Sequence, residues 1–265
     1  MTIHDGSSQA GQPQHVLPLT DPVEIAIRLV RYRFAMSFIK EGLVLDAGCG
    51  DRDGPLMLAE KGVRVIGVDV NVEAVRVARE RFRAASVSYG AVDCRNLPFR
   101  SDRFDAVISL EVIEHLPEED HRRYLEEMAR VVRPGGLYIG STPNRAMNEP
   151  GHVNEAHLKE YTLEEYRHIL EPHFSEAAVY GEHASPGFRM RARMCDATTQ
   201  GVMRWDGLGL RRILPRALRD GVKRLLSRQI FKVTEERLEQ GDCSITQDGL
   251  ERAVSFVAVC RKCRG

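Results

Sequence analysis

Two carboxylates and an imidazole lie within five consecutive residues, Glu111-Val112-Ile113-Glu114-His115, directly after a nearly all-apolar segment at 104–110. A second histidine, His157, follows further along the chain. Histidine ionises near neutral pH and can take a proton from a hydroxyl, and carboxylate and imidazole groups together can hold a divalent metal. The pattern indicates His115, Glu114 and His157 as candidate catalytic residues. The alternatives are a helix start with solvated glutamates and, for His157, an ordinary surface histidine.

A glycine-containing loop, Asp46-Ala47-Gly48-Cys49-Gly50, follows the first apolar strand-like segment. Glycine lets the backbone turn sharply and approach a ligand beside the N-terminus of the next helix. Asp69 lies 19 residues after Gly50, at the end of a β-branched segment, where an acidic residue accepts hydrogen bonds from ribose hydroxyls. A dinucleotide would also suit this pattern, and a tight turn without a ligand is the structural alternative. The GxGxxxG spacing and the carboxylate of Asp46 favour a nucleoside with a cationic amino-acid group, which points to S-adenosylmethionine.

Strand-like and helix-like segments alternate with short connections, which predicts a doubly wound α/β fold with a mostly parallel sheet between two helical layers. In such sheets ligands bind at the carboxyl ends of the strands, where the winding direction switches. The expected helices are 21–40, 55–61, 72–82, 118–132 and 162–170, and the expected strands are 43–45, 63–70, 86–89, 104–110, 137–141, 177–180 and 253–260.

The ordered set of motifs resembles the class I S-adenosylmethionine-dependent methyltransferases, from Arg31 to Gly181 and again in the last strand. The resemblance implies seven strands, the last of them antiparallel. The segments that carry it are 44–50, 67–69, Asp93 with 97–99, 104–107, 111–116 and 133–136.

The resemblance also implies where the cofactor binds. It assigns Asp46 and the glycine loop to the methionine moiety, Asp69 to the ribose, and Asp93 with Cys94 to the adenine. The full set of expected cofactor-binding residues is Asp46, Gly48, Cys49, Gly50, Asp69, Val70, Asp93, Cys94 and Glu111.

Within the family, the segments 31–35, 141–145 and 157–162 look like a bacterial, type 11-like subgroup that modifies small molecules or glycans. The expected activity is therefore O-methylation of a small-molecule, sugar or lipid-linked biosynthetic intermediate. A related sequence motif occurs in Hen-type small-RNA methyltransferases, where the residues that match Glu111, Glu114, His115 and His157 bind a divalent metal. Metal-dependent 2′-O-methylation of an RNA 3′ end is thus one alternative, and a non-catalytic cofactor-binding partner protein is another.

The chain has 265 residues, and its 38 Lys and Arg balance 38 Asp and Glu. The charges are unevenly distributed along the chain. The segment 189–232 contains twelve Lys and Arg and three Asp, for a net charge of +9, so all other residues together carry −9. The leucines of this basic segment recur at helical spacing, which predicts a helical lid or a contact with an anionic membrane surface, an acidic substrate or RNA. The expected organisation is a flexible leader at 1–20, a core at 21–184, a basic helical insertion at 185–245 and a final strand at 246–265.

The chain shows no apolar run long enough to span a bilayer and no basic-apolar signal at its start, so a cytoplasmic location, with peripheral membrane contact through the basic segment, is expected. Six cysteines are too few and scattered for a disulfide framework, and reduced thiols are expected. Cys260 and Cys263 form a lone CxxC, with Cys243 as the nearest third candidate for zinc, so inert thiols are the favoured interpretation. The sequence predicts no oligomeric state.

Overall fold

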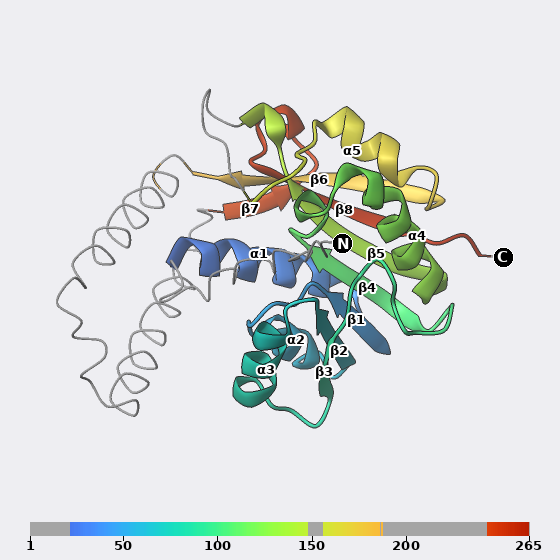
Figure 1. The fold of residues 1–265 in the computed structure, drawn as a ribbon. Helices are drawn as coiled ribbons and strands as arrows, with labels where there is room; N and C mark the ends of the chain where they lie inside the picture. Colours follow the sequence, from blue (N-terminus) through green and yellow to red (C-terminus); the bar gives the residue numbers. More distant parts are fainter. Residues whose placement is uncertain (1–21, 148–155, 186, 188–242, 265) are drawn as a thin grey trace, which may run out of the picture.

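The structure is a computed structural model that describes residues 22–147, 156–185, 187 and 243–264 (Figure 1). The leader expected at 1–20 and the basic segment at 189–232 lie outside the described residues, as does Cys195. No helix within the described ranges is both long and apolar enough to cross a bilayer.

A single eight-stranded sheet forms the centre of the molecule, in the order β3-β2-β1-β4-β5-β8-β6-β7 (Figure 1). The first five strands in this order pair in parallel, β8 is antiparallel to both of its neighbours, and β7 is antiparallel to β6. The strands are β1 Leu43–Ala47, β2 Arg64–Asp69, β3 Val87–Ala91, β4 Phe104–Leu110, β5 Val132–Pro143, β6 Glu176–Ala184, β7 Cys243–Thr246 and β8 Ser255–Arg261.

The predicted α/β fold with an antiparallel last strand is confirmed, but the count of seven strands is wrong. The additional strand is β7, which pairs with the end of β6 at the edge of the sheet. Its four residues, Cys-Ser-Ile-Thr, contain no apolar run. An edge strand of this length gives too little hydrophobic pattern to be found from the sequence.

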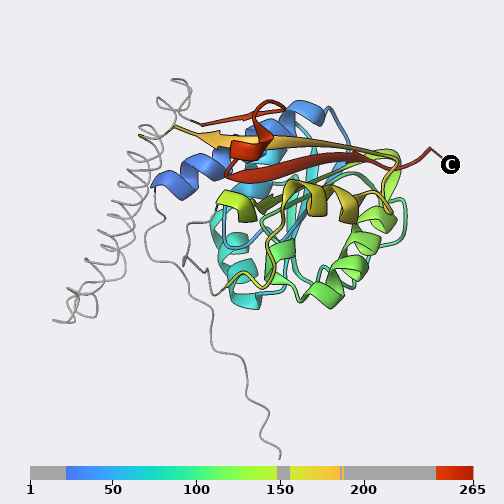
Figure 2. The same ribbon diagram turned by 90° about the horizontal axis from the view of Figure 1, so that it is seen from above.

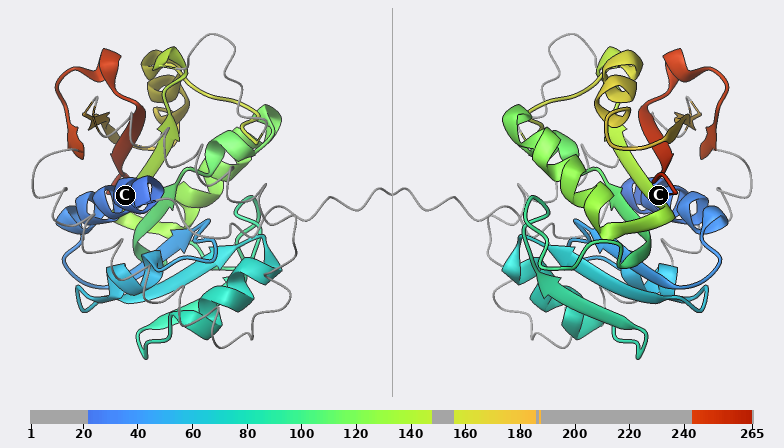
Figure 3. Two further views of the ribbon diagram at one scale, coloured as in Figure 1. Left: turned by 90° about the vertical axis from the view of Figure 1, so that its left-hand side faces the viewer. Right: turned by 90° about the vertical axis from the view of Figure 1, so that its right-hand side faces the viewer.

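Helices cover both faces of the sheet, and α1 and α4 lie on opposite sides of the central strands (Figure 3). One core cluster joins α1 and α2 to the sheet through Tyr32, Ala35 and Leu58, and the other joins α4 and α5 through Tyr124, Met128 and Tyr166. Figure 2 shows the same packing from above. The helices are α1 Pro22–Phe38, α2 Gly54–Ala59, α3 Val72–Arg81, α4 His121–Val131 and α5 Leu163–Leu170.

The starts of α5 and α4 are set by the residues next to them in sequence. Thr162 and Glu165 form a capping box at the start of α5, where each residue's side chain bonds the other's backbone N–H. The helix expected at 118–132 begins only at His121, because Glu118–Asp120 form a separate 3-10 turn. The strand expected at 137–141 is longer than predicted, because β5 begins at Val132, where its pairing with β4 is irregular.

The winding direction of the sheet switches between β1 and β4, which are neighbours although β2 and β3 separate them in sequence. The crevice at the carboxyl ends of these two strands is therefore the expected ligand site. Asp46 lies in β1 and Glu111 directly follows β4, so the candidate residues from both segments meet there.

Candidate functional site

Asp46 is a buried carboxylate at the end of β1, with 1% of its surface exposed. Its Oδ2 accepts a hydrogen bond of 2.8 Å from the hydroxyl of Tyr32 on α1. Burial raises the pKa of Asp46 to about 7, although the Tyr32 hydrogen bond acts in the opposite direction. The ring of Tyr32 lies directly over Gly54, where a Cβ atom would come within 2.2 Å of it. Glycine at position 54 is thus needed for α1 to reach Asp46.

The glycine loop is held against the end of β2 by its own backbone. The N–H groups of Gly48 and Cys49 both donate to Val68 O, at 2.8 and 3.0 Å, and Gly50 N–H donates to Asp69 Oδ2 at 2.9 Å. Gly48 has φ +86° and Gly50 has φ +60°, which favour glycine. The loop expected to bind the methionine moiety and the acidic residue expected to bind the ribose therefore form one unit.

Arg28, one turn before Tyr32 on α1, faces the same loop. Its Nη2 lies 3.0 Å from Asp53 Oδ1, while its Nε and Nη1 are buried and form no hydrogen bond with any of the described residues. Unpaired buried donors are rare in folded proteins and mark a place for an acceptor. S-Adenosylmethionine carries one ammonium and one carboxylate on its methionine end, and this site offers a carboxylate at Asp46 and free donors at Arg28. The residues present therefore fit the cofactor.

The carboxylate of Asp93, which is expected to bind the adenine, already accepts hydrogen bonds within the protein. Both oxygens of Asp93 accept from the Arg95 guanidinium at 2.7–3.1 Å, and this contact lowers the pKa of Asp93. Arg95 also bonds Asp120 at 2.5 Å, which ties the loop after β3 to the turn before α4. Cys94 is buried, and Val70 is 70% exposed. An adenine amino group would have to share Asp93 with Arg95.

Glu114, His115 and His157 come together although the sequence separates the two histidines. One ligand atom from each lies within 4.8 Å of the others, and the two imidazole rings meet edge-on with centroids 5.0 Å apart. Backbone hydrogen bonds hold them there: Leu158 N–H donates to Glu114 O at 2.7 Å. The segments on either side are joined by a buried hydrogen bond between His121 and Tyr161.

Glu114 is the buried member of this cluster, with 0% of its surface exposed. Among the described residues, neither of its carboxylate oxygens has a hydrogen-bond partner of standard geometry, and a contact with the Thr142 hydroxyl only partly offsets the effect of burial on its pKa. Burial raises the pKa of Glu114 well above its ordinary value, and the nearby carboxylate of Glu111 raises it further. A buried carboxyl group without a partner is costly in free energy unless a proton or a cation accompanies it.

Each histidine of the cluster has a partner for its Nδ1 atom. His115 Nδ1 lies 2.8 Å from Ala156 O, and because a carbonyl only accepts, Nδ1 carries the proton and Nε2 carries the lone pair in the neutral ring. His157 Nδ1 lies 2.5 Å from Glu160 Oε1. Such contacts to carbonyl and carboxylate groups orient histidines that take up protons or bind metals.

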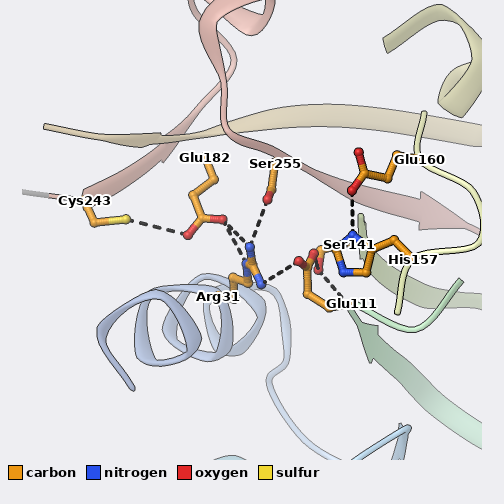
Figure 4. A network of polar contacts seen from close by, with 8 residues as sticks. All are labelled: Arg31, Glu111, Ser141, His157, Glu160, Glu182, Cys243 and Ser255. Atoms are coloured by element: carbon orange, nitrogen blue, oxygen red, sulfur yellow. Dashed lines mark hydrogen bonds and ion pairs between the residues drawn. The ribbon is translucent and has the colours of Figure 1, made fainter. Parts of the chain in front are cut away.

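Glu111, expected at the cofactor or a metal, is directed to a different set of partners (Figure 4). Its carboxylate accepts from Ser141 Oγ at 2.8 Å and pairs with Arg31 Nη1 at 3.3 Å. Of the four residues named for a metal by the resemblance, the structure thus groups three, and Glu111 belongs to the Arg31 network.

Known proteins similar to this chain share its core. Residues 44–136 match the family described as "Methyltransferase domain". A relative from Mycolicibacterium smegmatis named "Probable S-adenosylmethionine-dependent methyltransferase" is 36% identical over 131 residues, which cover 48% of this chain and 49% of the relative. The predicted resemblance to S-adenosylmethionine-dependent methyltransferases is confirmed over this part of the chain.

One further sequence relative and one solved structure are also similar to this chain. A ubiquinone biosynthesis O-methyltransferase from Rhizobium johnstonii is 36% identical over 110 residues, 40% of this chain and 44% of the relative. A solved methyltransferase structure from Thermotoga maritima superposes with a TM-score of 0.57 at 16% identity and covers 91% of both chains, which shows a shared fold. The chain spans about half the length of the curated relatives it matches.

The sequence analysis gave no site role to three residues of the candidate site, all on α1: Arg28, Arg31 and Tyr32. Arg31 and Tyr32 lie three and four residues after Arg28, so each is a neighbour of Arg28 on the helix surface. The helix was predicted from its apolar residues alone. The available signal was the set of polar side chains on a helix that packs into a core, where buried polar groups need partners.

Proposed function

We propose that the protein transfers a methyl group from S-adenosylmethionine to a hydroxyl group of a small-molecule, sugar or lipid-linked intermediate. The observation that carries this proposal is the cluster of Glu114, His115 and His157, which follows β4 at the switch point of the sheet, where Val112 packs against Gly48 of the glycine loop. We therefore assign proton removal to the end of β4 and the methyl donor to the end of the neighbouring strand β1. The O-methyltransferase among the relatives supports oxygen as the methylated atom.

The cofactor supplies a methyl group already activated on a sulfonium, so the protein's task is to orient the acceptor and manage its proton. We assign Asp46 to the ammonium of the methionine end and Arg28 to its carboxylate. Asp69 retains lone pairs for ribose hydroxyls beyond its bonds to the backbone N–H groups of Gly50 and Asn71. Each assignment places opposite charges or matched donors and acceptors together.

His115 is our candidate general base. Its Nδ1–H bond to Ala156 O leaves Nε2 as the atom that can take the acceptor's proton. Glu114 and His157 would orient this imidazole and the acceptor hydroxyl. A hydroxyl whose proton is removed as it attacks is a far better nucleophile than a neutral one.

A metal-assisted version of the same transfer has its own supporting observation, the unpaired buried carboxyl group of Glu114 between two histidines. A divalent cation held by Glu114, His115 and His157 would lower the pKa of a bound hydroxyl and replace His115 as the activating group. This version would also suit the ribose of an RNA 3′ end. The two versions exclude each other, because His115 Nε2 cannot bind a metal and accept the proton at once.

The test begins with calorimetric titration of the full chain with S-adenosylmethionine, for which we expect saturable binding. Transfer of an isotope-labelled methyl group is then measured with phenols, sugars, polyprenyl-linked sugars, amines and an RNA oligonucleotide. Label on a hydroxyl of a small molecule supports the proposal. Absence of cofactor binding, or label on amines alone, contradicts it, and label on the RNA 3′ end alone selects the RNA alternative.

A further inference from the structure

A buried arginine, Arg31, joins α1 to three strand ends at the edge of the candidate site (Figure 4). Its Nε and Nη2 donate to Glu182 Oε2 at 2.9 and 2.6 Å, and Nη2 also donates to Ser255 Oγ at 3.0 Å. Its Nη1 pairs with Glu111 Oε2 at 3.3 Å. Only 7% of Arg31 is exposed. All three nitrogens of the guanidinium are therefore engaged, each by partners distant in sequence.

Glu111 is the partner that lies at the switch point. It has φ +55°, a left-handed conformation that is unfavourable for a residue with a side chain. Its backbone N–H donates to Ser141 Oγ at 3.0 Å, and Ser141 Oγ in turn donates to Glu111 Oε1 at 2.8 Å. Backbone strain of this kind persists where the surroundings hold it, often at functional sites.

The remaining partners of Arg31 lie on the antiparallel strands β6 and β8. Glu182 on β6 and Ser255 on β8 are directly opposite each other in the sheet. Glu182 is fully buried, and its second oxygen accepts a weak bond of 3.6 Å from Cys243 Sγ on β7. The antiparallel strands β6 and β8 thus hold Nε and Nη2 of the guanidinium, while Nη1 contacts Glu111 at the end of the parallel strand β4.

We propose that Arg31 is a positioning residue that acts through Glu111: it fixes this carboxylate and its strained backbone at the mouth of the β1–β4 crevice. This inference rests on the proposed methyl transfer for its catalytic consequence. A purely structural ion pair would need only Glu182 and Ser255, which already satisfy Nε and Nη2. The contact of Nη1 with Glu111 adds a link from α1 and the antiparallel edge to the site.

The first experiment separates positioning from stability. Arg31→Met alone leaves Glu182 as a buried unpaired carboxyl group and is expected to destabilise the protein strongly. The double variant Arg31→Met/Glu182→Met removes both charges, so its melting temperature should return close to that of the wild type. Turnover should stay depressed by about 10- to 100-fold, because small displacements of site groups cost that much, while the cofactor's Kd changes by less than about threefold.

Arg133→Met serves as the matched control. Arg133 also pairs with a carboxylate, Asp105, at 2.7 Å, but at the amino end of β4, far along the strand from Glu111. This control should keep the turnover of the wild type. If Arg31→Met/Glu182→Met recovers turnover together with melting temperature, Arg31 is structural only and the proposal is overturned.

The second experiment needs no acceptor. In the Arg31→Met/Glu182→Met background, amide hydrogen exchange at Glu111, measured by NMR, should accelerate at least about tenfold, because the clamp on its strained backbone is weakened. Glu111→Gln and Arg31→Met should also be non-additive in denaturant unfolding, as expected of residues in contact. Unchanged exchange or full additivity refutes the positioning role. If no acceptor is ever methylated, the proposed function fails, but exchange and unfolding still decide the role of Arg31.

Discussion

Tyr32 and Asp46 form a hydrogen bond of 2.8 Å between α1 and the end of β1, and both side chains are buried. Helix α1 therefore contributes a side chain to the proposed cofactor site as well as covering the sheet. Because Asp46 has a pKa of about 7, its charge changes within the range in which most enzymes are assayed. Two pH effects follow, one on cofactor affinity and one on stability.

Affinity for S-adenosylmethionine should weaken as the pH falls from 8 to 6, because protonation of Asp46 removes the charge that would hold the cofactor's ammonium. Asp46→Asn should bind at least about tenfold more weakly, since a hydrogen bond to a charged group is worth roughly 1.5–3 kcal/mol, and should lose the pH dependence. Tyr32→Phe should shift the dependence to higher pH, because the hydrogen bond that lowers the pKa of Asp46 is gone. Calorimetry at several pH values measures all three, with Tyr166→Phe as a buried control whose hydroxyl has no partner.

Stability of the cofactor-free protein should respond to pH in the opposite sense. The pKa of Asp46 is raised from 3.8 in its ordinary state to about 7 in the fold, so the folded state holds the proton more tightly. The resulting stabilisation is fully present below about pH 3.8 and is lost as the pH rises through about 7, with a slope of at most about 1.4 kcal/mol per pH unit. Asp46→Asn should therefore be more stable relative to the wild type at pH 8 than at pH 5. Thermal melts at both pH values test this, and parallel pH profiles for the two proteins would contradict it.

Arg28→Met should weaken cofactor binding by about 10- to 100-fold, the value of a charge-assisted hydrogen bond to a carboxylate. The structural reason is that Arg28 Nε and Nη1 are buried and form no hydrogen bond with the described residues. The discriminating ligand is decarboxylated S-adenosylmethionine, which lacks the group that Arg28 would bind. Wild type and variant should bind this ligand with the same Kd. An equal loss of affinity for both ligands would place Arg28 outside the carboxylate site.

The alternation of apolar strands and amphipathic helices predicted the core of the fold because burial between two helical layers imposes that pattern directly. Glu114 and His115 could likewise be placed at a strand end from local sequence. Their meeting with His157 depends on Leu158 N–H bonding to Glu114 O, a backbone contact without a sequence signature. β7 was missed for a related reason, since its edge position depends on pairing and only weakly on hydrophobicity.

Glu111 shows the limit of reasoning from motifs. Its position beside Glu114 suggested a shared role, yet a left-handed φ of +55° directs it to Arg31 and Ser141. Arg31 lies 80 residues earlier on α1, and no periodicity in the sequence links the two. Long-range ion pairs of this kind are set by tertiary packing and become visible only in the folded chain.

His115→Ala should lower turnover by about 10²- to 10⁴-fold, the usual contribution of a general base, and leave the Kd of S-adenosylmethionine nearly unchanged. The reason is that His115 bonds Ala156 O and faces His157, while the residues proposed to bind the cofactor, Arg28, Asp46 and Asp69, have other partners. His168→Ala on the exposed side of α5 is the matched control and should keep full turnover. A His115→Ala variant with the wild-type rate would remove His115 from both versions of the mechanism.

Metal content decides between those two versions. If Glu114, His115 and His157 hold a divalent cation, titration of the metal-free protein with Mn²⁺, Co²⁺ or Zn²⁺ should saturate at one ion per chain, and chelation should lower turnover reversibly. Glu114→Gln and His157→Ala should each weaken metal affinity at least about tenfold.

Glu111→Gln is the informative control for the metal site, because Glu111 pairs with Arg31 and Ser141 outside the three-residue cluster. It should bind the metal as the wild type does, whereas a four-ligand site that includes Glu111 would lose affinity. A metal-free wild type that turns over at full rate would contradict metal assistance altogether. His115 Nε2 would then remain as the proton acceptor.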